Sequence, residues 1–123
     1  MPDQLSHLSQ AQHNENFVQT FDLDKTGYLD WVVTGIFYAG VHYVESFLAT
    51  KGFNSGNHME REKAIMSYPE LDPIINDYRT LKDESVEARY KIRKFFPSEV
   101  KDLLKGEFLN LKQHILKIAP PSP

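Results

Sequence analysis

The sequence contains no cysteine, which excludes disulfide bonds, thiolate metal sites and cysteine nucleophiles. It has no cationic start followed by an apolar run, and polar residues interrupt its longest apolar stretches. Neither a signal peptide nor a membrane span is therefore expected. No Gly-x-Ser-x-Gly elbow and no glycine-rich phosphate loop occur. We expect a cytoplasmic protein with no membrane partner and no cofactor.

Basic residues are scarce in the first half of the chain. Residues 1–60 hold two basic and seven acidic side chains, whereas residues 61–123 hold twelve basic and ten acidic ones. The net charge of -3 argues against a protein held on nucleic acid mainly by phosphate neutralisation. A dense basic cluster nevertheless occurs, and it is either a solvated helix face or a contact for a phosphate-bearing partner. Its members are Arg89, Lys91, Arg93 and Lys94.

The remaining composition is that of an ordinary globular domain. The chain has 123 residues, of which 41% are hydrophobic and 25% are charged. This length is enough for one hydrophobic core. We expect a single domain over residues 1–119, followed by a disordered tail over residues 120–123, where three prolines prevent a helix from continuing.

Apolar residues recur at helical spacing throughout, and no alternating pattern is long enough to indicate a strand. The sequence predicts an all-α, up-and-down helical bundle of four to five helices. The first expected helix begins near Pro2, the second spans residues 28–51, and the third begins at the Asn57 capping box. The fourth begins near Glu70, and the last begins after Pro97 with Ser98 as its N-cap. The expected inner positions of the first helix and its end are Leu5, Leu8, Phe17, Val18 and Phe21.

An acidic segment precedes the second helix. Asp22, Asp24, Thr26 and Gly27 fall at the first, third, fifth and sixth positions of an EF-hand loop. The twelfth position, which requires a bidentate carboxylate, is Val33. We therefore interpret the segment as an acidic turn between two helices, with the glycine available for a positive φ.

The second helix is apolar on nearly every face, so we expect it at the centre of the bundle, with Trp31 in the core. Small residues on one side, which are Gly35, Ala39 and Gly40, would let a neighbouring helix approach. Its polar residues follow one another four positions apart and form a ridge. The ridge consists of Asp30, Thr34, Tyr38, His42 and Ser46, with Glu45 one position to the side.

Buried hydroxyl and imidazole groups require hydrogen-bond partners, so Tyr38 and His42 admit two interpretations. In one they are satisfied core residues. In the other the ridge lines a cleft and meets polar residues of the fourth helix, with His42 as an acid or base and Arg89 as an anion clamp. The fourth-helix residues that share a face are Tyr78, Ser85 and Arg89.

The third helix begins with a second group of polar residues, His58, Glu60 and Arg61. They lack the His-Glu-x-x-His arrangement of a zinc protease, so no metal site is expected there. The other histidines, His7, His13 and His114, are isolated in the sequence and suggest no role.

Three segments together resemble the HEPN superfamily of small helical domains. They are "DWVVTGIFYAGVHYVESFLATKG" at residues 30–52, "HMEREKAI" at residues 58–65 and "YRTLKDESVEARY" at residues 78–90. The similarity extends over about residues 13–94. It implies an up-and-down bundle, often a homodimer, in a superfamily that includes metal-independent ribonucleases of toxin-antitoxin and phage-defence systems beside inactive, nucleotide-binding or assembly members.

The ribonuclease members of that superfamily carry an arginine followed, after four to six residues, by a histidine on a late helix. This chain departs from the pattern, because the next histidine after Arg89 is His114. Two functions remain open. The first is a non-catalytic, dimerising HEPN-like module that binds a nucleotide, an RNA or an antitoxin-type protein partner through a predicted site of Tyr38, His42, His58, Arg61, Ser85 and Arg89. The alternative is a metal-independent endoribonuclease or phosphodiesterase with an atypical His and Arg set, such as His42 or His58 with Arg61 or Arg89.

Overall fold

The computed structural model describes residues 3–121, and these contain helices and no strand. This confirms the predicted all-α bundle. The last two residues of the predicted disordered tail lie outside the described residues. The α-helices are α1 (Gln4–Gln19), α2 (Leu29–Thr50), α3 (His58–Ser67), α4 (Ile75–Tyr90), α5 (Pro97–Leu103) and α6 (Leu109–Ile118). A 3₁₀ turn, η1 (Pro69–Ile74), precedes α4, and a π turn, η2 (Leu104–Phe108), joins α5 to α6.

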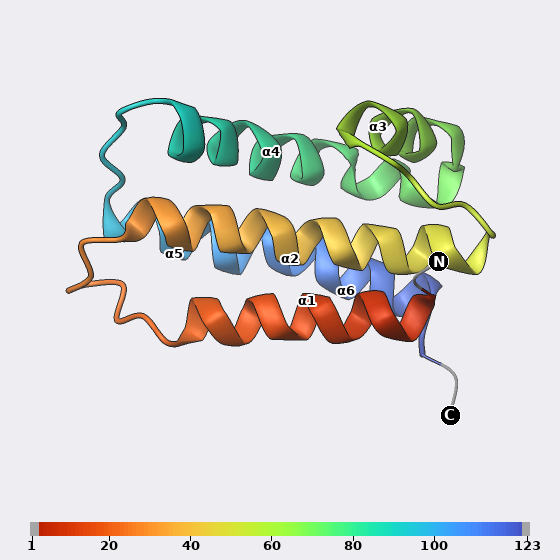
Figure 1. Cartoon of the computed structure of the whole chain (residues 1–123), viewed down its shortest axis with the longest axis horizontal. Helices are drawn as coiled ribbons and strands as arrows, with labels where there is room; N and C mark the ends of the chain where they lie inside the picture. The colour runs from red at the N-terminus through yellow and green to blue at the C-terminus, as the bar shows by residue number, and fades with distance from the viewer. Residues whose placement is uncertain (1–2, 122–123) are drawn as a thin grey trace.

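The long helices run alternately in opposite directions (Figure 1). Helix α2 lies in the middle, with α1 on one side and α4 on the other. Helices α5 and α6 continue through η2 as one rod behind α1 and α2. The short α3 crosses near the end of the bundle where α2 ends and α4 begins.

Helix α2 forms the centre of the core, as its apolar sequence predicts. Among the described residues it is the helix that has the length and composition to cross a membrane, and 78% of its most apolar window is buried inside the bundle. Its fully buried large side chains contact the surrounding helices from several sides. They are Val32, Val33, Ile36, Phe37, Phe47 and Leu48.

The glycines of α2 face two different helices, so the prediction of one small-residue face is wrong. A Cβ on Gly35 would lie 3.1 Å from side-chain atoms of both Phe17 and Val18 on α1. A Cβ on Gly40 would lie 3.3 Å from Leu81 on α4. The reason is geometric, because five residues along a helix of 3.6 residues per turn do not return to the same side.

Two loop glycines differ from each other in conformation. Gly52 ends α2 with a φ of 73°, the left-handed conformation that terminates many helices. Gly27 does not have a positive φ, so that expectation is wrong. The turn before α2 is shaped instead by Asp22, whose carboxylate accepts the amide of Asp24 at 3.1 Å.

The start of α3 agrees with the predicted cap. The Asn57 side chain accepts the amide of Glu60 at 2.9 Å. The Glu60 carboxylate reaches one residue further than a standard capping box and accepts the amide of Gly56 at 2.8 Å. Pro69 and Pro73 both fall within η1, so the regular α-helix starts after them, at Ile75.

Helix α4 ends at Tyr90, six residues before the predicted end, and the segment that follows is extended with Phe95 buried. Helix α5 begins at Pro97, with Phe96 as its N-cap residue. The prediction of Ser98 as N-cap is therefore wrong. Glu99 supplies the side-chain contact at this helix start, because its carboxylate accepts the amide of Phe96 at 2.9 Å.

Helix α1 turns a partly polar face toward the core. Leu5 and Phe17, expected inside, are 58% and 43% exposed, so the expectation is wrong for these two residues. It is confirmed for Val18, which is buried, and Leu8 and Phe21 pack partly buried against the core. Hydrogen bonds between polar side chains of α1 and α2 contribute to this orientation. The buried residues of α1 are His7, Ala11, Glu15 and Val18.

Candidate functional site

The polar ridge of α2 does not face one neighbour. Each step of four residues exceeds a full turn by about 40°, so the ridge winds around the helix. Thr34 and Ser46 donate to carbonyl oxygens of their own helix, at 2.9 and 2.6 Å. The side chains that reach other helices are Tyr38, His42 and Glu45.

Tyr38 meets Arg89, in the last turn of α4. The guanidinium donates from Nη1 to the Tyr38 hydroxyl at 3.2 Å, from Nη2 to the buried Ser85 hydroxyl at 3.1 Å, and from Nε to the Ser85 carbonyl at 3.3 Å. It also lies 5.8 Å from the ring centroid of Phe37 and 5.0 Å from that of Tyr90. These contacts hold the charged group in one place between two helices.

Arg89 carries a positive charge that no carboxylate neutralises within 4.0 Å among residues 3–121. Two other arginines show the contrast. Arg61 pairs with Glu45 at 2.7 Å, and Arg93 bridges two glutamates at 2.9 and 2.6 Å. All the partners of Arg89 are neutral oxygens and aromatic rings, so this guanidinium keeps its full charge for an anion.

A hollow of about 390 Å³ opens beside Arg89. Two of its aromatic residues are unusually exposed, Trp31 by 59% and Tyr90 by 74%. The expected core position of Trp31 is therefore wrong, because this residue lies in the first turn of α2, at the end of the bundle. The lining residues are Asp30, Trp31, Thr34, Tyr38, Ala88, Arg89 and Tyr90.

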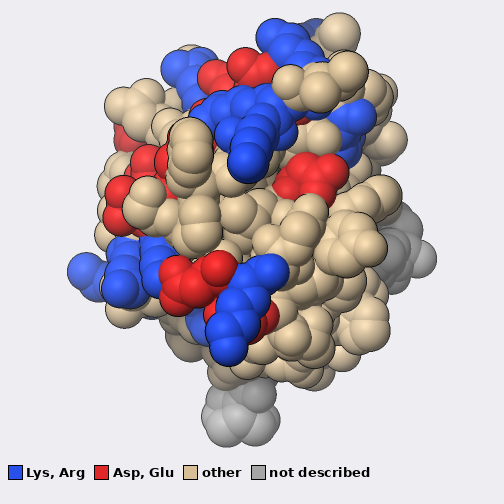
Figure 2. Space-filling model, turned by 90° about the vertical axis from the view of Figure 1, so that its left-hand side faces the viewer, with Lys and Arg blue, Asp and Glu red and all other residues tan. Residues whose placement is uncertain are grey.

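The charges on this end of the molecule are mixed. Figure 2 looks onto the end where α2 begins and α4 ends, and it shows Lys and Arg side chains in both the upper and the lower part, with Asp and Glu side chains among them. Part of the basic cluster is neutralised, since Lys91 pairs with Glu87 at 3.3 Å and Arg93 is paired as above. An anionic ligand would therefore meet a local charge at Arg89, whereas a broad basic surface is absent from this view.

Arg61 belongs to a second, more buried cluster where α2 meets α3. Its Nε donates to Glu45, which also accepts the hydroxyl of Ser55. Its Nη1 lies 2.9 Å from His58 Nδ1 and 3.4 Å from the Tyr78 hydroxyl. With only 11% of the Arg61 side chain exposed, this guanidinium is committed to holding α3 on α2.

His58 lies between the two arginines. Burial lowers the pKa of His58, and the charges of Arg61, Arg89 and Lys82 lower it further. The ring is therefore neutral at pH 7, with Nδ1 accepting from Arg61 and the proton on Nε2. Its centroid lies 5.8 Å from that of Phe37, the ring that also contacts Arg89.

His42 faces α1. Its Nδ1 lies 3.1 Å from Nδ1 of His7, and burial, followed by the neighbouring imidazole, lowers its pKa. Burial also lowers the pKa of His7, and the Nε2 atom of His7 has no hydrogen-bond partner among the described residues. In a neutral pair, Nδ1–H of His7 donates to Nδ1 of His42, and Nε2 of His7 is then an acceptor without a partner among the described residues. A buried acceptor without a partner costs less free energy than a buried donor without one.

The structure thus divides the predicted site residues among three places. Tyr38, Ser85 and Arg89 form one group, and His58 joins it to the cluster of Arg61. His42 hydrogen-bonds to α1, and the charges that shift its pKa do not include Arg89.

Sequence reasoning missed several residues of these groups. His7 was assigned no role, although it lies at i, i+4 and i+8 spacing with two other buried residues of α1, Ala11 and Glu15. Trp31 and Tyr90 were not assigned to the site either. Tyr90 is exposed at the end of α4, and the sequence placed that end six residues too late. Trp31 is exposed because it lies in the first turn of α2.

Comparison of the chain with protein-family models, with curated proteins and with solved structures finds no match.

Proposed function

We propose that the protein is a non-catalytic, HEPN-like module that binds a phosphate-bearing nucleotide or RNA at Arg89. The observation that carries the proposal is the unpaired charge of Arg89, fixed by Ser85 and Tyr38 at the edge of a hollow with exposed aromatic rings. Dimerisation and an antitoxin-type protein partner remain part of this proposal through the resemblance in sequence.

The hydrogen-bonding capacity around Arg89 suits a phosphate oxygen. A guanidinium has five N–H groups, and the contacts with Ser85 and Tyr38 use three of them. The contact with the Tyr90 hydroxyl, at 3.4 Å, is long and exposed, so a ligand can replace it. The Tyr38 hydroxyl accepts from Arg89 and still has its own proton to donate.

The rest of the hollow suits the nucleoside part of the same ligand. The rings of Trp31 and Tyr90 offer exposed faces on which a base can stack. Asp30 lies on the same wall and can accept hydrogen bonds from an exocyclic amino group or a ribose hydroxyl. Arginine, aromatic rings and one carboxylate form a set that distinguishes a nucleotide from inorganic phosphate.

The alternative function, a metal-independent ribonuclease, has one observation in its favour. His58 is neutral at pH 7 and lies close enough to Arg89 for the guanidinium charge to lower its pKa. A neutral imidazole can remove the 2′-hydroxyl proton while an arginine stabilises the transition state. The non-catalytic proposal is preferred because His58 Nδ1 is already occupied by Arg61 and the nuclease motif is missing.

Fluorescence titration tests the binding proposal directly, because Trp31 is the single tryptophan of the chain and lines the hollow. AMP, ADP and a short single-stranded RNA are the probes. We expect quenching of Trp31 and a loss of affinity of about tenfold or more in Arg89→Ala, since hydrogen bonds to charged groups have about this effect. The matched control is Arg79→Ala, which changes an exposed arginine of the same helix that has no ion pair within residues 3–121.

The proposal fails if none of the three probes changes the fluorescence at millimolar concentration, or if Arg79→Ala weakens binding as much as Arg89→Ala. RNA cleavage in the presence of EDTA that stops in His58→Ala would establish the alternative instead. Light scattering at tens of micromolar measures the oligomer, and we expect twice the 14.2 kDa mass of one chain. A monomeric mass would remove dimerisation from the proposal.

A further inference from the structure

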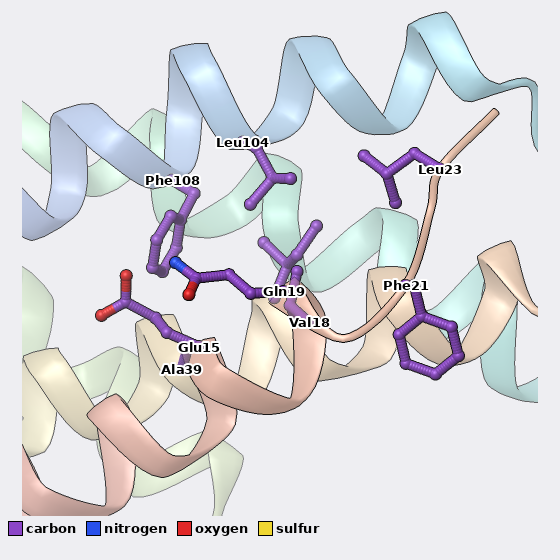
Figure 3. Close-up of a pocket in the computed structure, with 9 residues that line it drawn as sticks. Glu15, Val18, Gln19, Phe21, Leu23, Ala39, Leu104 and Phe108 are labelled. Atoms are coloured by element: carbon purple, nitrogen blue, oxygen red, sulfur yellow. The ribbon is translucent and has the colours of Figure 1, made fainter.

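A second hollow lies between α1, the loop that follows it, α2 and the π turn η2 (Figure 3). Its volume is about 270 Å³, and it shares no lining residue with the hollow beside Arg89. Figure 3 shows side chains from α1 and from η2 reaching toward each other across it. The lining residues are Glu15, Val18, Gln19, Phe21, Leu23, Ile36, Ala39, Leu104 and Phe108.

Most of this wall is apolar, and its inner part is buried. Val18, Ile36, Ala39 and Phe108 are each at most 4% exposed, so they belong to the core of the bundle. Protein cores are close-packed, and voids larger than a water molecule are few. Apolar cavities of about 150 Å³ already bind benzene, so a hollow of this size and lining has room for an organic ligand.

One end of the hollow carries a carboxylate. Glu15 is 9% exposed, and its two oxygens accept hydrogen bonds from the Tyr43 hydroxyl and from Lys112 Nζ, the latter at 2.9 Å. Burial raises the pKa of Tyr43, and its bond to Glu15 raises it further, so the phenol stays a donor. A carboxylate only accepts hydrogen bonds, and each oxygen has a second lone pair, so this end favours a ligand with a donor group.

The opposite wall is formed by an uncommon backbone conformation. The π turn η2 interrupts the rod of α5 and α6, and its first and last residues, Leu104 and Phe108, both line the hollow. Single π turns are rare and occur frequently at functional sites. The turn therefore forms one wall of the hollow, with α1 on another side.

The loop between α1 and α2 covers the hollow at one side. Phe21 and Leu23 line it, and Asp24 on the same loop pairs with Lys101 of α5 at 2.8 Å. This ion pair is exposed and therefore weak. Phe21 and Leu23 are partly buried and pack against the core, so they form an apolar side of the hollow.

From this geometry we infer that the hollow binds a small amphiphile of up to roughly nine non-hydrogen atoms, with an apolar body and an amine or hydroxyl group that donates to Glu15. The size follows from the volume of the hollow and the roughly 30 Å³ that a water-sized group occupies. The donor group follows from the carboxylate at the polar end. The inference is independent of nucleotide binding at Arg89.

Three probes of equal chain length separate the chemistries: hexylamine, hexan-1-ol and hexanoate. Binding is followed by amide chemical shifts in NMR spectra of the full chain. We expect shifts at Ala39, Leu104 and Phe108 with the amine and the alcohol, and none with hexanoate, because its carboxylate would face Glu15. In Glu15→Gln, the affinity for hexylamine should fall about tenfold or more, while that for hexan-1-ol changes less than about threefold.

Filling the hollow gives the second test. Ala39→Leu places extra carbons inside it, and Leu104→Phe does so from the half-exposed wall, so either variant should abolish binding of both probes. The control, Leu109→Ala, changes an exposed leucine just after η2 and should leave binding unchanged. Circular dichroism establishes that each variant is folded, and a filling variant that does not fold is replaced by the other.

Three results would overturn the inference. The first is the absence of shifts at the lining residues with all probes at millimolar concentration. The second is tighter binding of hexanoate than of hexylamine. The third is unchanged binding in a folded filling variant, which would place the ligand elsewhere.

Discussion

Replacing Arg61 by methionine removes the charged partner of a buried carboxylate at the junction of α2 and α3. Glu45 and Arg61 lie 2.7 Å apart, with 5% and 11% of their side chains exposed. Methionine keeps the apolar length of the arginine stem, so the substitution mainly removes charge and hydrogen bonds. Among the described residues, Glu45 then retains Ser55 as its one side-chain partner, and the free energy of unfolding should fall by about 3–5 kcal/mol.

A double variant separates the cost of an unpaired charge from the value of the pair. Glu45→Leu with Arg61→Met removes both charges, and apolar residues of similar size are frequently tolerated in place of a buried ion pair. We therefore expect the double variant to recover most of the loss. Urea unfolding of wild type, both single variants and the double variant at pH 7.5, followed by circular dichroism, gives the coupling energy.

The single and the double variants together show whether the unpaired charge of Glu45 causes the deficit. The reasoning is refuted if the single variant loses less than about 1 kcal/mol, the value of an exposed pair, or if the double variant is no more stable than Arg61→Met.

Three further predictions concern stability measured by urea unfolding. Burial lowers the pKa of His7 and His42, so the unfolded chain takes up protons at a higher pH than the folded chain does. The free energy of unfolding should therefore fall as pH drops below about 6.5, by at most about 1.4 kcal/mol per pH unit for each proton. Equal stability at pH 7.5 and 5.5 would contradict this. Gly52→Ala should cost roughly 1 kcal/mol because the residue has a φ of 73°, whereas Gly27→Ala, with negative φ and open space, should be nearly neutral. Tyr43→Phe removes a donor to the buried carboxylate of α1 and should cost about 1–3 kcal/mol, and no loss would show that this bond does not hold α1.

The sequence was sufficient to predict the all-α bundle and the central place of α2. A helix with apolar residues on nearly all faces needs neighbouring helices on all sides, and this can be recognised from the sequence of that helix alone. The shared face of Tyr78, Ser85 and Arg89 on α4 was likewise predicted by their spacing of seven and four residues, and the structure confirms the contact between Ser85 and Arg89. These features depend on helix geometry alone.

Other features depend on contacts between residues far apart in the chain. The rotation of α1 is set by bonds such as that between His7 and His42, which the sequence separates by 35 positions. The end of α4 depends on Phe95 being buried against the core beyond the helix. Apolar periodicity does not encode either effect, so Leu5, Phe17 and Trp31 were placed inside when they lie at the surface.

The buried polar residues of α1 have a consequence for the motions of the bundle. Helix α1 buries His7 and Glu15 beside Ala11 and Val18, whereas the buried residues of α2 are mostly apolar, so opening α1 should expose less apolar area and cost less free energy than opening α2. Amide hydrogens of α1 should therefore exchange with solvent while α2 is still protected. Protonation of both His7 on α1 and His42 on α2 leaves no acceptor in the hydrogen bond between them, so α1 should open more readily as pH falls.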